Sequence, residues 1–162
     1  MDILMEKAQG RVPVTILGLK GDLDASNFQE VIKKVRRYIR ERLEVWDVDA
    51  SSIYDLMMAA TEAMTNIILH GYHGQAGLIK VSVQNDGNDV AITLQDESAS
   101  FDPNNASRPD ITLPLEQRPL GGVGIFLMQD CMDQIIHEVL PQGGNKLTLI
   151  KRNIIRTADK EV

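Results

Sequence analysis

Three polar side chains recur every four residues inside the otherwise apolar run 61–74, TEAMTNIILHGYHG. They are Glu62, Asn66 and His70, and in a helix this spacing places them along one stripe. Asn is unfavourable inside a helix unless its amide is used. Its oxygen suits a hard cation such as Mg²⁺, and Glu62 could accept a proton from an attacking hydroxyl or water. A buried polar network or a solvent-facing stripe is the alternative that the spacing leaves open.

A second candidate is Asp96, the first charged residue after the strand-like segment VAITLQ. A carboxylate at the end of a strand can accept a hydrogen bond from an exocyclic amine, such as the one that adenine carries. The alternative is a turn in which the Asp side chain bonds to its own backbone. In isolation, Asp96 therefore indicates either a ligand contact or a turn.

A third candidate is the run Gly121, Gly122, Val123 and Gly124, which directly precedes a helical pattern. Glycines allow close approach of the backbone to a ligand, and the start of a helix favours phosphate. The run lacks the Gly-Lys-Ser/Thr ending of a Walker A loop and the third spaced glycine of the dinucleotide fingerprint. A flexible loop that joins a helix is the alternative reading.

The apolar periodicity predicts the elements that must position these residues. Asp24 or Ser26 could cap the first helix, and Ser51 and Ser52 could cap the second. Runs of alternating residues indicate strands, and apolar residues at helical intervals indicate helices. In order, the predicted elements are a strand over 12–21, a helix over about 26–43, a helix from 51 or 52 to 70, a hairpin of 79–84 and 89–95, a long loop after 96, a helix from about 121, and a hairpin of 135–140 and 146–152.

Hairpins favour antiparallel pairing, and the helices need one common surface to cover. The sequence therefore predicts a two-layer α/β sandwich. Its sheet would be mixed but mostly antiparallel, with three helices on one face and a long loop beside them. We expect one domain over residues 1–162, with a core over about 12–152 and a frayed C-terminal tail.

Composition sets further expectations for this chain of 162 residues. Its 43% hydrophobic and 25% charged residues are those of a globular protein, and its apolar runs are too short to span a membrane. The single cysteine, Cys131, cannot form an internal disulfide, so we expect a reducing, cytoplasmic location. A net charge of -6 argues against direct binding of nucleic acid.

Taken together, the three candidate sites resemble the motifs of a known superfamily. EAMTNIILHGY resembles the N-box of the Bergerat-fold (GHKL) ATPases, DESASFDP resembles their adenine-binding box, and GGVGIFLMQDCMD resembles their second glycine box. The segments FDP and LMQDCMDQI…GGNKLTLIKR are most similar to those of the anti-sigma-factor serine/threonine kinases. The similarity covers residues 27–152, and three motifs in order are far more specific than any one.

The resemblance implies a kinase that uses ATP and Mg²⁺ and works mostly by positioning and charge neutralisation. The acceptor would be a Ser or Thr of an anti-anti-sigma factor, a STAS protein. The protein would also sequester a sigma factor, and members of the family form homodimers. The implied roles are Glu62 as general base, Asn66 as Mg²⁺ ligand, His70 beside the phosphates, Asp96 at the adenine amine, and Gly122, Val123 and Gly124 at the phosphates, under a lid over 104–121.

The chain departs from the family pattern at the adenine box. The family often has Asp-x-Gly-x-Gly, whereas Ser98 and Ser100 take the glycine positions here. The two serines would tighten the nucleotide pocket and weaken ATP binding, and Ser98 would be one of the ATP-binding residues. Arg108 and Arg118 in the lid are candidate contacts for the γ-phosphate.

Two alternatives to a serine/threonine kinase follow from the same residues. Ser98 and Ser100 motivate a nucleotide-binding regulatory module that switches partners without phosphoryl transfer. The ATP-binding half of a histidine kinase is the other alternative. It would need an upstream phosphoacceptor histidine, and no histidine precedes His70.

Overall fold

A computed structural model describes residues 3–6, 14–19, 25–99, 112, 114 and 122–156. In chain order, the elements are β1 (Ile3–Glu6), β2 (Val14–Leu19), α1 (Ala25–Val45), α2 (Ala50–Asn66), the π-helical turn η1 (Ile67–Gly71), β3 (Gly77–Asp86), β4 (Asp89–Asp96), α3 (Gly122–Cys131), β5 (Gln134–Val139) and β6 (Asn145–Lys151).

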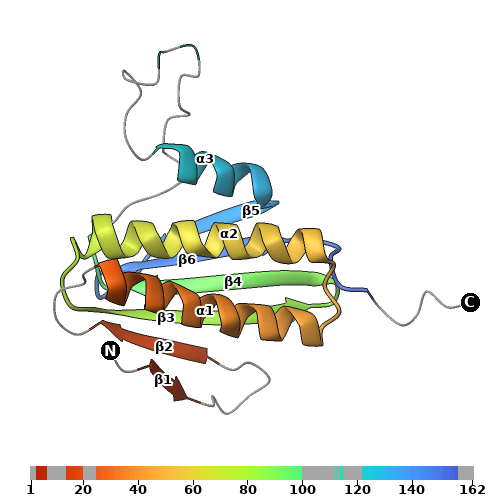
Figure 1. Cartoon of the computed structure of the whole chain (residues 1–162), viewed down its shortest axis with the longest axis horizontal. Coiled ribbons are helices and arrows are strands. Elements are labelled where there is room, and N and C mark those ends of the chain that lie inside the picture. The colour runs from red at the N-terminus through yellow and green to blue at the C-terminus, as the bar shows by residue number, and fades with distance from the viewer. Residues whose placement is uncertain are drawn as a thin grey trace, which may run out of the picture.

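The strands form one six-stranded sheet in the order β1-β2-β3-β4-β6-β5. Helices α1, α2 and α3 lie on one side of this sheet, with α3 near the β5 edge (Figure 1). The predicted two-layer α/β sandwich is confirmed. Every pairing between the described strands is antiparallel, so the parallel pair that a mixed sheet would contain is not found among them.

The N-terminal part of the sheet differs from the prediction. The expected strand 12–21 is the shorter β2, and β1 was not predicted at all. β1 spans four residues, Ile3–Glu6, which is too short to display an alternating pattern. It forms the outer edge of the sheet through pairing with β2 alone.

The core lies between the helices and the inward face of the sheet. Alternate residues of β3 and β4 point into it, including Val81 and Ile92, neither of which is exposed. On α2 and η1, the residues that face the core are Leu56, Met57, Ala60, Met64 and Ile68, with Ile53 and Ile67 half-buried. In and after α3, Ile125, Met128 and Met132 are buried, and Cys131 is half-buried. Within the described residues, no helix is long and apolar enough to cross a membrane.

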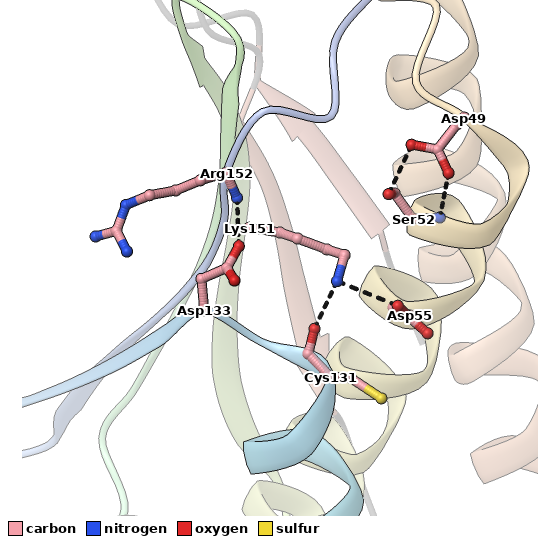
Figure 2. Close-up of polar contacts among 7 residues, drawn as sticks. All are labelled: Asp49, Ser52, Asp55, Cys131, Asp133, Lys151 and Arg152. Atoms are coloured by element: carbon pink, nitrogen blue, oxygen red, sulfur yellow. Dashed lines mark hydrogen bonds and ion pairs between the residues drawn. The ribbon is translucent and has the colours of Figure 1, made fainter.

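Asp49 caps the N-terminus of α2, in place of the predicted Ser51 or Ser52. Its Oδ1 accepts from the backbone N–H of Ser52 at 2.9 Å, and its Oδ2 accepts from the Ser52 hydroxyl at 2.7 Å (Figure 2). A carboxylate caps a helix well because it satisfies an unpaired N–H and also interacts favourably with the helix dipole. Ser51 and Ser52 instead lie within the first turn.

The cap makes the stability of the fold depend on pH in a defined direction. The backbone hydrogen bond from Ser52 is the main cause that lowers the pKa of Asp49. A lowered pKa stabilises the fold above the unfolded value of about 3.9, and this stabilisation is lost as pH falls through the folded pKa. We expect D49A to lower the free energy of unfolding by about 1 kcal/mol at neutral pH. The difference from the native chain should shrink below about pH 4.

Urea unfolding followed by circular dichroism, repeated from neutral pH to pH 3, measures this effect. The exposed Glu41 of α1 gives a control, E41A, which also removes a carboxylate but no cap. A native-like free energy for D49A at neutral pH would contradict the role of Asp49.

Lys151 at the end of β6 joins the sheet to two helices (Figure 2). Its Nζ lies 3.1 Å from Asp55 Oδ2 on α2 and donates to the carbonyl of Cys131, at the C-terminus of α3, at 2.8 Å. The side chains of Lys151 and Asp55 are 17% and 26% exposed, so solvent screens the pair only partly. This contact fixes α3 relative to α2.

We expect K151M to destabilise the protein by about 2 kcal/mol, because Asp55 and the Cys131 carbonyl each lose a charged partner. D55N combined with K151M should recover part of the loss, since the unpaired carboxylate is then gone. Thermal unfolding measures both, with K80M, at an exposed position of β3, as the control. Equal melting temperatures for K151M and K80M would contradict the role of Lys151.

Candidate functional site

The predicted polar stripe runs from α2 into η1. Glu62 and Asn66 are half-buried on α2, and His70 is exposed on η1. The prediction of one α-helix to residue 70 is corrected here, because the α-helix ends at Asn66 and a π-helical turn follows. The N–H of Tyr72 bonds to the carbonyl of Ile67 at 2.8 Å, an i→i+5 contact. Such turns are frequent at functional sites, and this one displaces His70 from a straight α-helical stripe.

Asn66, His70, Asp96 and Ser98 line one pocket. Asp96 ends β4 and is 5% exposed, whereas Ser98 is half-buried in the segment after it. The pocket is small in this structure, with a cavity volume of about 40 Å³. Four of the predicted site residues therefore meet in one cavity. The other lining residues are Ala63, Ile67, Gly71, Ala99, Met128, His137, Asn145 and Leu147.

Glu62 lies at the other end of the stripe, against the first turn of α3. A Cβ added at Gly124 would overlap the Glu62 carboxylate, so only glycine fits there without displacing it. The helix begins at Gly122, so Gly122, Val123 and Gly124 form its first turn and do not precede it as a loop. The first N–H groups of a helix lack partners within the helix and favour an anion. Asn66 is one helical turn from Glu62 and lines the pocket at Asp96.

Asp96 is held by hydrogen bonds to one of its two oxygens. Its Oδ1 accepts from the backbone N–H of Ser98 at 2.9 Å, from the Ser98 hydroxyl and from Asn145 Nδ2 at 3.1 Å. Within the described residues, every hydrogen bond of this carboxylate falls on Oδ1. No hydrogen bond from that part of the chain falls on Oδ2.

Tyr72 holds the backbone beside Asp96 in place. Its hydroxyl donates to the carbonyl of Leu78 at 2.6 Å and accepts from the N–H of Glu97 at 2.8 Å. Burial is the main cause that raises the pKa of Tyr72, and the charges of Asp96 and Glu97 add to it. The hydroxyl therefore stays protonated and keeps its bond to β3.

Several predicted residues lie outside the part of the chain that the structure describes. They are Ser100, Arg108 and Arg118, together with the lid over 104–121 apart from positions 112 and 114. Their roles stay predictions.

Asn145 and His137 line the pocket but were not predicted from the sequence. His137 Nε2 lies 2.8 Å from Asn145 Oδ1, and Asn145 is 5% exposed. Each is a polar residue at an inward-facing position of a strand, which is the signal that could have identified it. Gly144 has φ +92°, and a Cβ there would overlap the Asp96 carbonyl, so β6 begins in close contact with the end of β4.

Residues 26–151 match the family model of the histidine kinase-like ATPase domain. The anti-sigma F factor of Thermoanaerobacter sp. (strain X514) is 33% identical over 106 residues, which are 65% of this chain and 73% of that protein. The serine-protein kinase RsbW of Bacillus thuringiensis (strain Al Hakam) is 37% identical over 92 residues, 53% of this chain and 58% of that protein.

A solved structure of the RsbU and RsbW domains of Rv1364c from Mycobacterium tuberculosis shares the fold. It superposes with a TM-score of 0.55 at 21% identity, over 88% of this chain and 33% of that one. The family model covers most of the chain, and its boundaries enclose all of the site residues described above. The chain therefore belongs to the histidine kinase-like ATPase family, and its relatives there include anti-sigma factors and serine-protein kinases.

Proposed function

We propose that this protein binds ATP with Mg²⁺ and transfers the γ-phosphoryl group to a Ser or Thr of an anti-anti-sigma (STAS) protein. The observation that carries the proposal is the single pocket that gathers Asn66, His70, Asp96 and Ser98. The contact of Glu62 with Gly124 places a carboxylate at the first turn of α3, one helical turn from Asn66.

The lining of the pocket supports an adenine nucleotide as the ligand. Asp96 Oδ2 would accept from the exocyclic amine, and the apolar side chains of Met128 and Leu147 would line the base. The N–H groups at the start of α3 would bind phosphate. His70 would lie near the nucleotide, at the exposed rim of the pocket.

Asn66 would hold Mg²⁺ through its side-chain oxygen. This ion usually takes few protein ligands, and phosphate and water complete its octahedral shell. The ion would neutralise phosphate charge, while Glu62 would accept the proton of the attacking hydroxyl. The half-buried position of both residues on α2 supports this division of roles.

The relatives named anti-sigma F factor and serine-protein kinase RsbW support a regulatory role. We propose that the protein also sequesters a sigma factor and that phosphorylation of the STAS partner controls this binding. A homodimer is the expected assembly.

The test is transfer of label from γ-labelled ATP to a STAS protein, with purified components and Mg²⁺. The expected result is one labelled Ser or Thr on the STAS protein, and no labelling when Mg²⁺ is chelated. If ATP binds but no label is transferred to any STAS protein of the source organism, the kinase proposal fails.

The second candidate function is a nucleotide-binding regulatory module without transfer. The observation in its favour is Ser98, whose hydroxyl donates to Asp96 and which packs so closely on Gly71 that a Cβ there would overlap it. This module predicts that E62A leaves partner binding and signalling unchanged. Loss of signalling in E62A, with fold and partner binding preserved, would reject it.

A further inference from the structure

We infer that Asn145, supported by His137, is a positioning residue that sets the preference of this site for 6-amino over 6-oxo purine nucleotides. It does so by fixing which group Asp96 offers to the base. The inference rests on the proposed binding of a purine nucleotide, and it concerns two residues to which the preceding proposal gives no role.

Asn145 is placed for this role by the sheet. It is the first residue of β6 and lies directly opposite Asp96, the last residue of β4, in the antiparallel register. Both residues are 5% exposed. Gly144 lies so close to the Asp96 carbonyl that a Cβ there would overlap it, so the two strand ends meet in close contact.

The orientation of the Asn145 amide follows from its neighbours. Its Nδ2 lies 3.1 Å from Asp96 Oδ1 and 3.2 Å from the carbonyl oxygens of both Ser98 and Ala99. All three neighbours are acceptors, so the amide must present its NH₂ group to them. The reversed amide would place an oxygen against three oxygens.

His137 stabilises this orientation from the other side. Its Nε2 lies 2.8 Å from Asn145 Oδ1, and an amide oxygen can only accept. Nε2 must therefore carry a proton and donate. His137 on β5 thus holds the amide so that its NH₂ group faces Asp96.

This arrangement determines what Asp96 can recognise. Oδ1 receives donors from Ser98 and Asn145, which fix the carboxylate in rotation, and no described residue donates to Oδ2, which can accept from a base. An acceptor pairs with a 6-amino group. A 6-oxo group would present a second acceptor and leave a buried polar group unpaired, which costs affinity.

The experiment compares the affinities of ATP and ITP, which differ at position 6 of the purine, for the full chain by calorimetry. The native chain should prefer ATP. N145L removes the amide at similar volume, and we expect the ATP-to-ITP preference to fall by about tenfold, because the carboxylate can then rotate. If Asn145 only supports the fold, N145L should lower the affinities for ATP and ITP equally and leave the ratio of the two affinities unchanged.

N145D gives a sharper result. Two carboxylates in contact tend to share one proton, and a protonated oxygen can donate to a 6-oxo group. We expect ITP to gain affinity relative to ATP. H137F should lower the preference for ATP. H137Q, whose side chain still has a hydrogen-bond donor, should keep the native preference. N85L and N85D, at an exposed position of β3, serve as matched controls with the native ratio.

The outcomes separate this inference from the proposed function. If the native chain prefers ATP but N145L, N145D and H137F all keep the native ratio, the assignment of Asn145 and His137 is overturned and nucleotide binding stands. If the native chain binds neither nucleotide, the proposed function fails and this inference fails with it. Should N145L not fold, N145D and H137F decide the question.

Discussion

Replacement of Glu62 by glutamine is expected to lower the rate of phosphoryl transfer by about 10²- to 10⁴-fold, the usual contribution of a general base. E62Q keeps the shape of the side chain beside Gly124 but removes the charge that would accept the proton. Affinity for ATP should change little, because the predicted adenine contact lies at Asp96. Single-turnover transfer of label to a STAS protein measures the rate, and calorimetry measures the affinity.

E41Q, at an exposed position of α1, is the matched control and should transfer at the native rate. If E62Q transfers phosphoryl at the native rate, Glu62 is not the general base.

The contact between Glu62 and Gly124 allows an independent check of the same role. G124A adds a methyl group where the Glu62 carboxylate lies, so the carboxylate must move. The rate should fall although the carboxylate is still present. In the double variant E62Q/G124A, the two losses of transfer rate should not add, because each substitution removes the same function of the Glu62 carboxylate. Additive effects would show that Gly124 acts separately from Glu62.

Replacement of Asp96 by asparagine is expected to weaken ATP binding by about 10- to 100-fold, the value of a hydrogen bond to a charged group. The donors from Ser98 and Asn145 require an oxygen at the Oδ1 position. The amide of D96N must therefore turn its NH₂ group to the ligand, where it would face the donor of the adenine amine. Calorimetric titration with ATP and with ADP measures the loss.

D96N should differ in kind from E62Q. At saturating ATP its transfer rate should recover, since Asp96 contributes binding, whereas the rate of E62Q should stay low. D86N, at the exposed end of β3, is the control for loss of a carboxylate. If D96N binds ATP with the native affinity, the adenine ring does not bind at Asp96.

The sequence by itself determined much of the local structure. The spacing of Glu62 and Asn66 predicted one stripe on α2, from which the π-helical turn displaces His70. The alternating segments predicted the hairpins β3–β4 and β5–β6. These features follow from periodicity within a few residues, which side-chain chemistry alone can set. The three motifs, in their order, also predicted the family.

Only the tertiary structure revealed the residues that surround Asp96. Asn145 is 49 residues away in the chain and reaches Asp96 because β4 and β6 pair in one particular register. The contact between Glu62 and Gly124 likewise depends on how α3 packs against α2. The short strand β1 also becomes a strand through pairing with β2.

The physical reason for this difference is the separation along the chain of the residues that interact. Helical and strand periodicities arise between neighbours in the chain, so the sequence displays them directly. A hydrogen bond such as that of Asn145 to Asp96 depends instead on strand register and on the close packing that glycine permits at position 144. Strand register and close packing are properties of the assembled sheet, and local sequence patterns do not predict them.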